Sequence, residues 1–261
     1  MRKAPHNRDA FGQALYDCYG GKTGHALVIE RDDGLVDADS LATAYLSEYK
    51  DWPIQQRKAI RLARGKVLDV GCGAGRHSLH LQQKGLDALG IDASPLAIEV
   101  CKLRGLRSAK VMSIDRIGAG LGTFDTIIML GNNFGLLGGL ERGRVLLRRF
   151  HRMTGRAARI IAETLDPYRT DDPCHLAYHK LNRARGRLAG QLRIRARYKD
   201  LATSWFDYLF VSKEEMRFML DGTGWKAVRF IESGGPAYVA VIEKDRRARR
   251  EDAPALPGGI Q

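Results

Sequence analysis

Short apolar runs alternate with stretches of helical periodicity through the middle of the chain. The apolar runs are rich in β-branched and aliphatic residues, which suits strands buried on both faces of a parallel sheet; they cover residues 67–70, 88–91, 124–130 and 158–165. Helical stretches cover 76–84 and 141–153, and Ser94 and Pro95 are residue types that favour another helix start. Strands that alternate with helices predict an α/β fold.

The segment before residue 61 has a different pattern. Its apolar residues fall on one face of short helices, at 9–20, around 41–49 and at 51–64, and a short extended segment interrupts them at 25–30. The pattern predicts a mainly helical prefix of about sixty residues.

The segment after residue 165 is too long for a simple connection. About forty residues precede Trp205, which predicts an inserted cap at 166–204. A strand-like run follows at 205–211, and Ser212 with Glu215 has the capping-box pattern of a helix start. The last predicted elements are strands at 226–232 and 238–243 and a basic tail at 246–261, which we expect to be disordered.

Three glycines at alternate positions, Gly71, Gly73 and Gly75, follow the strand at 67–70 at once. Without a Cβ the backbone can turn sharply, and a ligand can lie against it before the next helix begins. A dinucleotide-binding fold would show G-x-G-x-x-G, with a pyrophosphate on the helix N-terminus. The spacing here is G-x-G-x-G, which disfavours a nicotinamide enzyme.

Two carboxylates narrow the choice of ligand. Asp69 lies two residues before Gly71, where it would repel a pyrophosphate but pair well with an ammonium group. Asp92 ends the strand at 88–91, where its two oxygens can accept hydrogen bonds from both hydroxyls of a ribose. An amino acid joined to a nucleoside fits both ends of this site.

The stretch V-L-D-V-G-C-G-A-G followed by L-G-I-D-A-S-P resembles the first two motifs of class I S-adenosylmethionine-dependent methyltransferases. Residues 113–115 and 124–132 resemble the third and fourth motifs, and the likeness covers 60–165 closely and 205–245 loosely. It implies a Rossmann-like α/β fold: a mostly parallel seven-stranded sheet with helices on both faces and a final strand inserted antiparallel. The expected domains are a helical lid at 1–60, a methyltransferase domain at 61–245 with the cap inserted after strand 5, and the tail.

The resemblance also implies a cofactor, S-adenosylmethionine, whose product is S-adenosylhomocysteine, and no metal. Asp69 and the glycines would hold the methionine part, Asp92 the ribose and Asp115 the adenine amino group. The full set of residues expected to bind the cofactor is Asp69, Gly71, Cys72, Gly73, Gly75, Asp92, Ala93, Ser113, Ile114, Asp115, Leu130, Gly131 and Asn132.

The acceptor site is less defined. In many small-molecule members of this family a helical prefix folds over the cofactor, so Tyr16, Tyr19, Tyr45, Tyr49 and Trp52 either line the cavity, with Asn133 and Tyr168, or simply bury the prefix. His175 and His179 are four residues apart and are the candidate bases, with a surface role as the alternative. The segment 131–139 lacks the Pro-Pro-aromatic tetrad of base-amine methyltransferases and a cysteine nucleophile. We therefore expect methyl transfer to an oxygen or nitrogen of a small molecule, anionic molecules included.

Charge keeps other functions open. The formal net charge is +13, and the stretch 180–199 carries arginines without an acidic residue until Asp200. Such a stretch suits an RNA or protein methyltransferase that contacts its substrate there. Because Arg193, Arg195 and Arg197 alternate with apolar residues, a strand with one solvated face is the favoured reading. A regulatory protein that binds an adenosyl ligand without catalysis is the third possibility.

The remaining composition sets broad limits. Four scattered cysteines without C-x-x-C spacing predict neither zinc nor a disulfide framework, and His77 with His80 lacks a third metal ligand. No apolar run approaches the roughly 20 residues that span a bilayer, and the first residues lack the apolar core of a secretory signal. We expect a cytoplasmic protein without membrane contact, and the sequence leaves its oligomeric state open.

Overall fold

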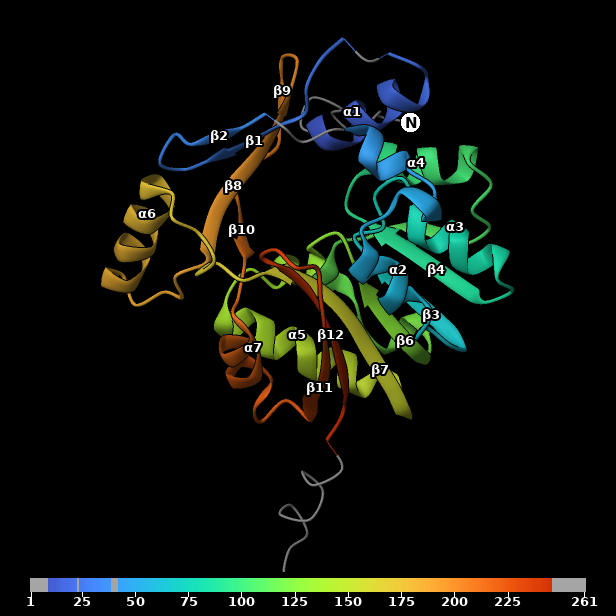
Figure 1. The fold of residues 1–261 in the computed structure, drawn as a ribbon. Helices are drawn as coiled ribbons and strands as arrows, with labels where there is room; N and C mark the ends of the chain where they lie inside the picture. The colour runs from blue at the N-terminus through green and yellow to red at the C-terminus, as the bar shows by residue number, and fades with distance from the viewer. Residues whose placement is uncertain (1–8, 23, 39–41, 246–261) are drawn as a thin grey trace, which may run out of the picture.

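The computed structural model describes residues 9–22, 24–38 and 42–245, so the predicted disordered tail lies outside the described residues. Its main sheet has seven strands in the order β11-β12-β7-β6-β3-β4-β5 (Figure 1). Their bounds are β3 Lys66–Val70, β4 Asp87–Asp92, β5 Ala109–Val111, β6 Phe124–Met129, β7 Thr154–Leu165, β11 Trp225–Glu232 and β12 Ala237–Lys244. Strands β3 to β7 pair in parallel, whereas β12 lies antiparallel between β7 and β11. The predicted mostly parallel sheet with an inserted antiparallel strand is confirmed.

Helices cover both faces of the main sheet (Figure 1). Successive strand residues point to opposite faces, so Val67 packs with α2 (Ile54–Ile60) and α3 (Arg76–Gln83) on one face. Leu68 packs with α5 (Leu140–Arg152) and α7 (Lys213–Leu220) on the other. Helix α4 (Pro95–Leu103) starts at the expected cap, because the Ser94 hydroxyl accepts a hydrogen bond from the Ala97 N–H at 2.9 Å. The Ser212–Glu215 capping box also forms at the start of α7.

A second sheet, which we call the roof sheet, joins the N-terminal segment to the insertion. It contains β1 (Val28–Arg31), β2 (Val36–Asp37), β8 (Gln191–Tyr198), β9 (Leu201–Ala202) and β10 (Phe206–Leu209), in the order β10-β8-β1-β2 with β9 on β8. All its pairs are antiparallel. In Figure 1 the blue β1 lies beside the orange β8, although the two are far apart in sequence.

The description of the prefix as helical needs correction. Helices α1 (Ala10–Tyr19) and α2 form near their predicted positions, but α2 ends four residues early. Segment 42–51 forms only the 3₁₀ turns η2 (Ala42–Leu46) and η3 (Tyr49–Asp51), and β1 and β2 are strands. The reason is tertiary: β8 supplies backbone partners that local periodicity does not reveal. The insertion likewise contributes α6 (Pro173–Ala184) and three strands, and its sheet extends to Leu209, beyond the expected limit at 204.

Alternation along β8 separates an apolar face from a charged one. Ile194, Ala196 and Tyr198 are buried, and the last two pack against α1. The arginines on the opposite face meet acidic residues of neighbouring strands: Glu30 lies 2.9 Å from Arg195 and 3.2 Å from Arg197, and Asp207 lies 3.5 Å from Arg193. The predicted alternation of a buried apolar face with a charged face along this strand is therefore confirmed. No helix among the described residues has the length and apolar character needed to cross a membrane.

Candidate functional site

The glycine turn after β3 can be built only with glycines. Gly71 and Gly75 have φ values of 73° and 77°, in the left-handed region that side chains disfavour. A Cβ on Gly71 would lie 2.7 Å from the Asn133 amide nitrogen, and one on Gly75 would lie 2.9 Å from the Cys101 Sγ. Side chains of the protein therefore pack against one side of this turn, and its backbone faces the site on the other side.

A buried carboxylate, Asp69, and a half-buried one, Asp92, form the floor of the site. Asp69 is 1% exposed and accepts a hydrogen bond from the Ser78 hydroxyl at 2.6 Å. Burial, reinforced by the nearby Asp92 carboxylate, raises the pKa of Asp69 to about 7. Asp92 accepts hydrogen bonds from the Gly73 N–H and the Ser94 N–H, each at 2.9 Å, and burial raises its pKa as well. A floor with this acidic character favours a cationic ligand.

A second turn follows β6, as the sequence predicts. Leu130 is buried, and Gly131 and Asn132 both have positive φ, 74° and 64°. The Tyr208 hydroxyl donates to the Asn132 carbonyl at 2.6 Å, which fastens the roof sheet to this turn. The Asn132 Oδ1 is buried and has no hydrogen-bond partner among the described residues.

Glu163 is a central residue that sequence reasoning missed. It lies on β7, is 2% exposed, and its carboxylate accepts a hydrogen bond from the Gly131 N–H at 2.6 Å. Gln55 and Gln56 donate to its two oxygens at 3.0 and 2.6 Å. A signal was available, because a glutamate inside an otherwise apolar strand must have partners when it is buried.

Of the five prefix aromatics, only Tyr45 is placed over the glycine turn. Its ring would be 3.5 Å from a Cβ on Gly73, and it meets Phe11 edge-on at 5.1 Å between ring centroids. Tyr49 stacks on His80 at 4.5 Å, and Trp52 meets His77 edge-on at 4.6 Å, so both pack the prefix onto α3.

The two remaining prefix tyrosines lie on the exposed side of α1. Tyr16 is exposed, and the Tyr19 hydroxyl donates to the Leu103 carbonyl at the end of α4, 3.3 Å away. For these two, as for Tyr49 and Trp52, the placement favours the packing alternative over a role in lining the cavity.

Two side chains that we expected to contact a ligand, Asn133 and Asp115, bond other groups of the protein. The Asn133 amide donates to the carbonyls of Val70 and Gly71, at 3.0 and 2.7 Å, so it holds the end of β3 rather than facing an acceptor. Asp115, in η4 (Ile114–Arg116) after Ser113, is exposed and pairs with Arg142 at 2.8 Å. Its expected contact with adenine stays a prediction. Cys72 is buried beneath the turn, and Ala93 is exposed beside Asp92.

The candidate bases lie on α6, beside the roof sheet and away from α3 and α4 (Figure 1). The His175 Nδ1 is 3.2 Å from the Thr170 hydroxyl. His179 is buried, and its ring lies 6.1 Å from that of Tyr168; burial lowers the pKa of His179. The Tyr168 hydroxyl donates to Glu215 of α7 at 2.6 Å, and partial burial together with this bond raises the pKa of Tyr168 to about 12. The hydrogen bonds and ring contacts of these residues join α6 to its neighbours rather than to the glycine turn.

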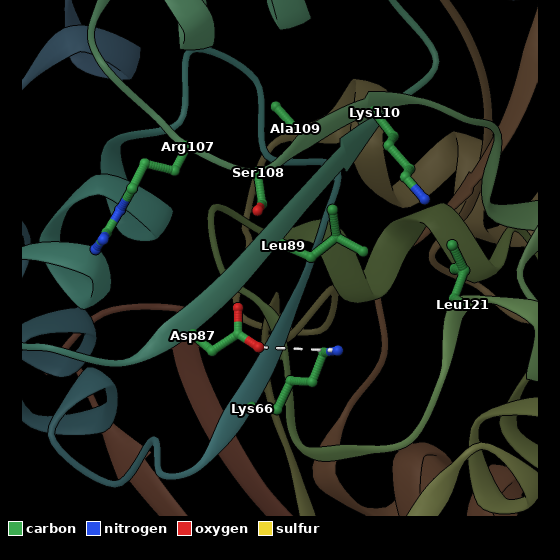
Figure 2. Close-up of a pocket in the computed structure, with 8 residues that line it drawn as sticks. All are labelled: Lys66, Asp87, Leu89, Arg107, Ser108, Ala109, Lys110 and Leu121. Carbon is green, nitrogen blue, oxygen red and sulfur yellow. Dashed lines mark ion pairs between the residues drawn. The ribbon is translucent and has the colours of Figure 1, made fainter.

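Figure 2 shows a separate hollow of about 350 Å³ at the opposite end of the main sheet, where β3 and β4 begin. Lys66 and Asp87 pair across it at 3.8 Å, whereas Arg107 points away from that pair. Because it lies at the start of β3 and β4 and the two turns follow strand ends, this hollow is not part of the site. Among the described residues, no group of three or more side chains could hold a metal ion.

The residues at the two turns fit an adenosyl amino acid. The floor is acidic, the glycines allow a ligand to approach the backbone closely, and the buried Asn132 Oδ1 has no donor among the described residues. The main sheet, its antiparallel last strand and this site define a methyltransferase domain of class I. A family model described as "Methyltransferase domain" matches residues 67–157. The chain thus carries a class I S-adenosylmethionine-dependent methyltransferase domain.

Solved structures show the same fold. A SAM-dependent methyltransferase from Bacteroides fragilis in complex with S-adenosyl-L-homocysteine is 28% identical, with a TM-score of 0.78 over 93% of this chain and 98% of that one. CcbJ methyltransferase from Streptomyces caelestis, 14% identical, has a TM-score of 0.56 over 75% of this chain and 94% of its own. At that identity the second similarity shows the fold alone.

Curated relatives match a shorter stretch. A ubiquinone biosynthesis O-methyltransferase from Xanthomonas oryzae is 36% identical over 72 residues, 25% of this chain and 30% of that protein. A 2-heptyl-1-hydroxyquinolin-4(1H)-one methyltransferase from Mycobacteroides abscessus is 40% identical over 70 residues, 24% of this chain and 31% of that protein. The chain thus spans less than a third of the length of these relatives.

Proposed function

We propose that this protein transfers the methyl group of S-adenosylmethionine to an oxygen or nitrogen of a small molecule, anionic molecules included. The observation that carries the proposal is the acidic floor around the glycine turn, formed by Asp69 and Asp92. The bound cofactor supplies an electrophilic methyl group on a cationic sulfur. The names of the curated relatives include two methyltransferases, one of them an O-methyltransferase, which favours a hydroxyl acceptor here.

The chain's own residues bind and orient the cofactor and exclude water. Asp92 accepts the ribose hydroxyls, Asp69 balances the positive charge of the amino acid end, and the backbone of the Gly71–Gly75 turn supports it. Tyr45 covers the glycine turn, and Tyr208 of the roof sheet holds the turn after β6; together they keep water out and align donor with acceptor.

His179 is a candidate base predicted from the sequence. Burial lowers the pKa of His179, which keeps the imidazole neutral near pH 7, but α6 holds the ring against Tyr168 and away from the glycine turn. That placement favours the alternative to a base role. His175 remains the other candidate base. The cytoplasmic location is likewise an expectation carried over from the sequence.

The test combines binding with turnover. Calorimetry should detect S-adenosylhomocysteine binding to the purified protein, and fractions of a cell extract should release S-adenosylhomocysteine from S-adenosylmethionine, with and without ribonuclease. Turnover that survives ribonuclease supports a small-molecule acceptor. Turnover that ribonuclease abolishes would assign RNA instead, and binding without any turnover would assign a regulatory adenosyl-binding protein. Absence of binding would end the proposal.

A further inference from the structure

Glu163 joins three parts of the fold through one buried carboxylate. Its Oε1 accepts a hydrogen bond from the Gln55 side chain at 3.0 Å. Its Oε2 accepts from the Gln56 side chain at 2.6 Å and from the backbone N–H groups of Gly131 at 2.6 Å and Asn132 at 3.4 Å. A buried charge is costly unless donors surround it. Four donors from α2 and from the turn after β6 fulfil that condition.

The two backbone donors come from consecutive residues in the left-handed region. Successive N–H groups in such a turn form a concave anion site, and here the anion is the protein's own Glu163. Asparagine tolerates positive φ better than most residues, but it still disfavours it. The carboxylate therefore stabilises a turn that the local sequence does not favour by itself.

The backbone of Asn132 is held at both of its polar groups. Its N–H bonds Glu163, and its carbonyl accepts the Tyr208 hydroxyl at 2.6 Å. Only the side-chain amide remains, and its Oδ1 is buried with no hydrogen-bond partner in the part of the chain that the structure describes. These two bonds fix the backbone of Asn132, and with it the point from which its side chain starts, next to Tyr208 of the roof sheet.

The same carboxylate is connected to the segment over the glycine turn. The Gln56 Oε1 accepts a hydrogen bond from the Arg76 guanidinium at 3.1 Å. Arg76 in turn donates to the Ala44 carbonyl at 2.8 Å and to the Ser47 hydroxyl at 3.2 Å, on either side of Tyr45. A continuous set of hydrogen bonds therefore runs from residues 44–47 through Arg76 and Gln56 to Glu163.

We propose that Glu163 is a positioning residue. It holds the Gly131–Asn132 turn in the conformation that presents the Asn132 amide oxygen to an O–H or N–H of the methyl acceptor. Through Gln56 and Arg76 it couples that turn to the segment that covers the glycine turn. The inference rests on the proposed function, because the turn belongs to the proposed cofactor and acceptor site.

The test compares Glu163→Gln with Glu243→Gln. The control also removes one carboxylate. It is suitable because Glu243 lies on β12 and pairs with Arg159 at 3.1 Å, away from the turn. Amide hydrogen exchange is followed by mass spectrometry for peptides covering 128–136 and 42–57, with and without S-adenosylhomocysteine, and calorimetry gives its affinity. In Glu163→Gln an amide group replaces one oxygen, so we expect turn exchange at least 10-fold faster and affinity about 10-fold weaker. The control should stay within 2-fold in both.

A second variant keeps the inference testable if Glu163→Gln does not fold. Gln56→Met removes the side chain that joins Glu163 to Arg76 and leaves the backbone bonds of the turn intact, so turn exchange should change less than 3-fold. S-adenosylhomocysteine should then protect the 42–57 peptide less than in the wild type, with affinity about 3-fold weaker. Wild-type turn exchange in Glu163→Gln, or wild-type protection in Gln56→Met, would overturn the positioning role.

The failure of the proposed function gives a different result. A wild-type protein that binds no S-adenosylhomocysteine would remove the cofactor assignment. The exchange rate of the 128–136 peptide without ligand would still report whether Glu163 holds the turn.

Discussion

Replacement of Asp92 by alanine removes the group that we place against the ribose. In the free protein its two oxygens each accept one backbone hydrogen bond, from Gly73 and Ser94 at 2.9 Å, and each oxygen retains a lone pair for a ligand hydroxyl. Leaving such hydroxyl partners unpaired costs about 1–3 kcal/mol, so the Kd for S-adenosylhomocysteine should rise at least roughly 5- to 150-fold. Asp92→Asn keeps one acceptor oxygen, so its Kd should lie between those of the wild type and Asp92→Ala.

Isothermal calorimetry at pH 8 measures this effect directly. The matched control is Asp87→Asn, because Asp87 begins the same strand but is exposed and pairs with Lys66 at the opposite end. An analogue without the ribose 2′-hydroxyl provides a second check: it should bind the wild type more weakly than S-adenosylhomocysteine does, whereas Asp92→Ala should hardly distinguish the two. A folded Asp92→Ala protein with a Kd within threefold of the wild type would refute the ribose assignment.

Three further predictions concern pH, the roof sheet and the glycine turn. Because the pKa of Asp69 is raised to about 7, its contribution to the stability of the free protein is complete below about pH 4 and is lost as the pH rises to about 7. The affinity for S-adenosylhomocysteine, measured by calorimetry, should increase over the same pH range. Asp69→Asn should make that affinity nearly independent of pH. Tyr208→Phe leaves the Asn132 carbonyl without its donor and should lower the free energy of unfolding in urea by about 1 kcal/mol, a loss that an unchanged midpoint would contradict. Gly75→Ala should lower the free energy of unfolding more than Gly85→Ala does. Both glycines have positive φ, but only at Gly75 would the new Cβ lie 2.9 Å from the Cys101 Sγ. Equal losses of about 1–2 kcal/mol in the two variants would mean that backbone strain alone matters.

The parallel core was predictable because its signals are local. Val67 to Val70 form an apolar run next to glycines, and Ser94 and Ser212 are residue types whose side chains cap the helices that follow them. Each of these features depends on neighbours within a few residues. The acidic ends of β3 and β4 were also readable, because the strand ends and the carboxylates adjoin.

The roof sheet was not predictable from local pattern. Strand β1 has four residues, two of them charged, and its partner β8 lies far along the chain, as the bond between Glu30 and Arg195 over 165 residues shows. Glu163 was overlooked for a related reason: its strand is apolar, and its donors Gln55 and Gln56 come from a helix about 107 residues away. Pairing between distant segments decides both cases.

The pairing of β1 with β8 also dictates an order of events during synthesis. Domains fold as the chain emerges from the ribosome, N-terminal parts first. Strand β1 can pair with β2 at once, but its other neighbour, β8, is absent until residues 191–198 have been made. The strands β3 to β7 are complete by Leu165 and precede β8 along the chain. The β1–β2 pair must therefore wait for β8 while the nucleoside-binding core assembles, and a ribosome stalled before residue 191 would display that core without a complete roof sheet.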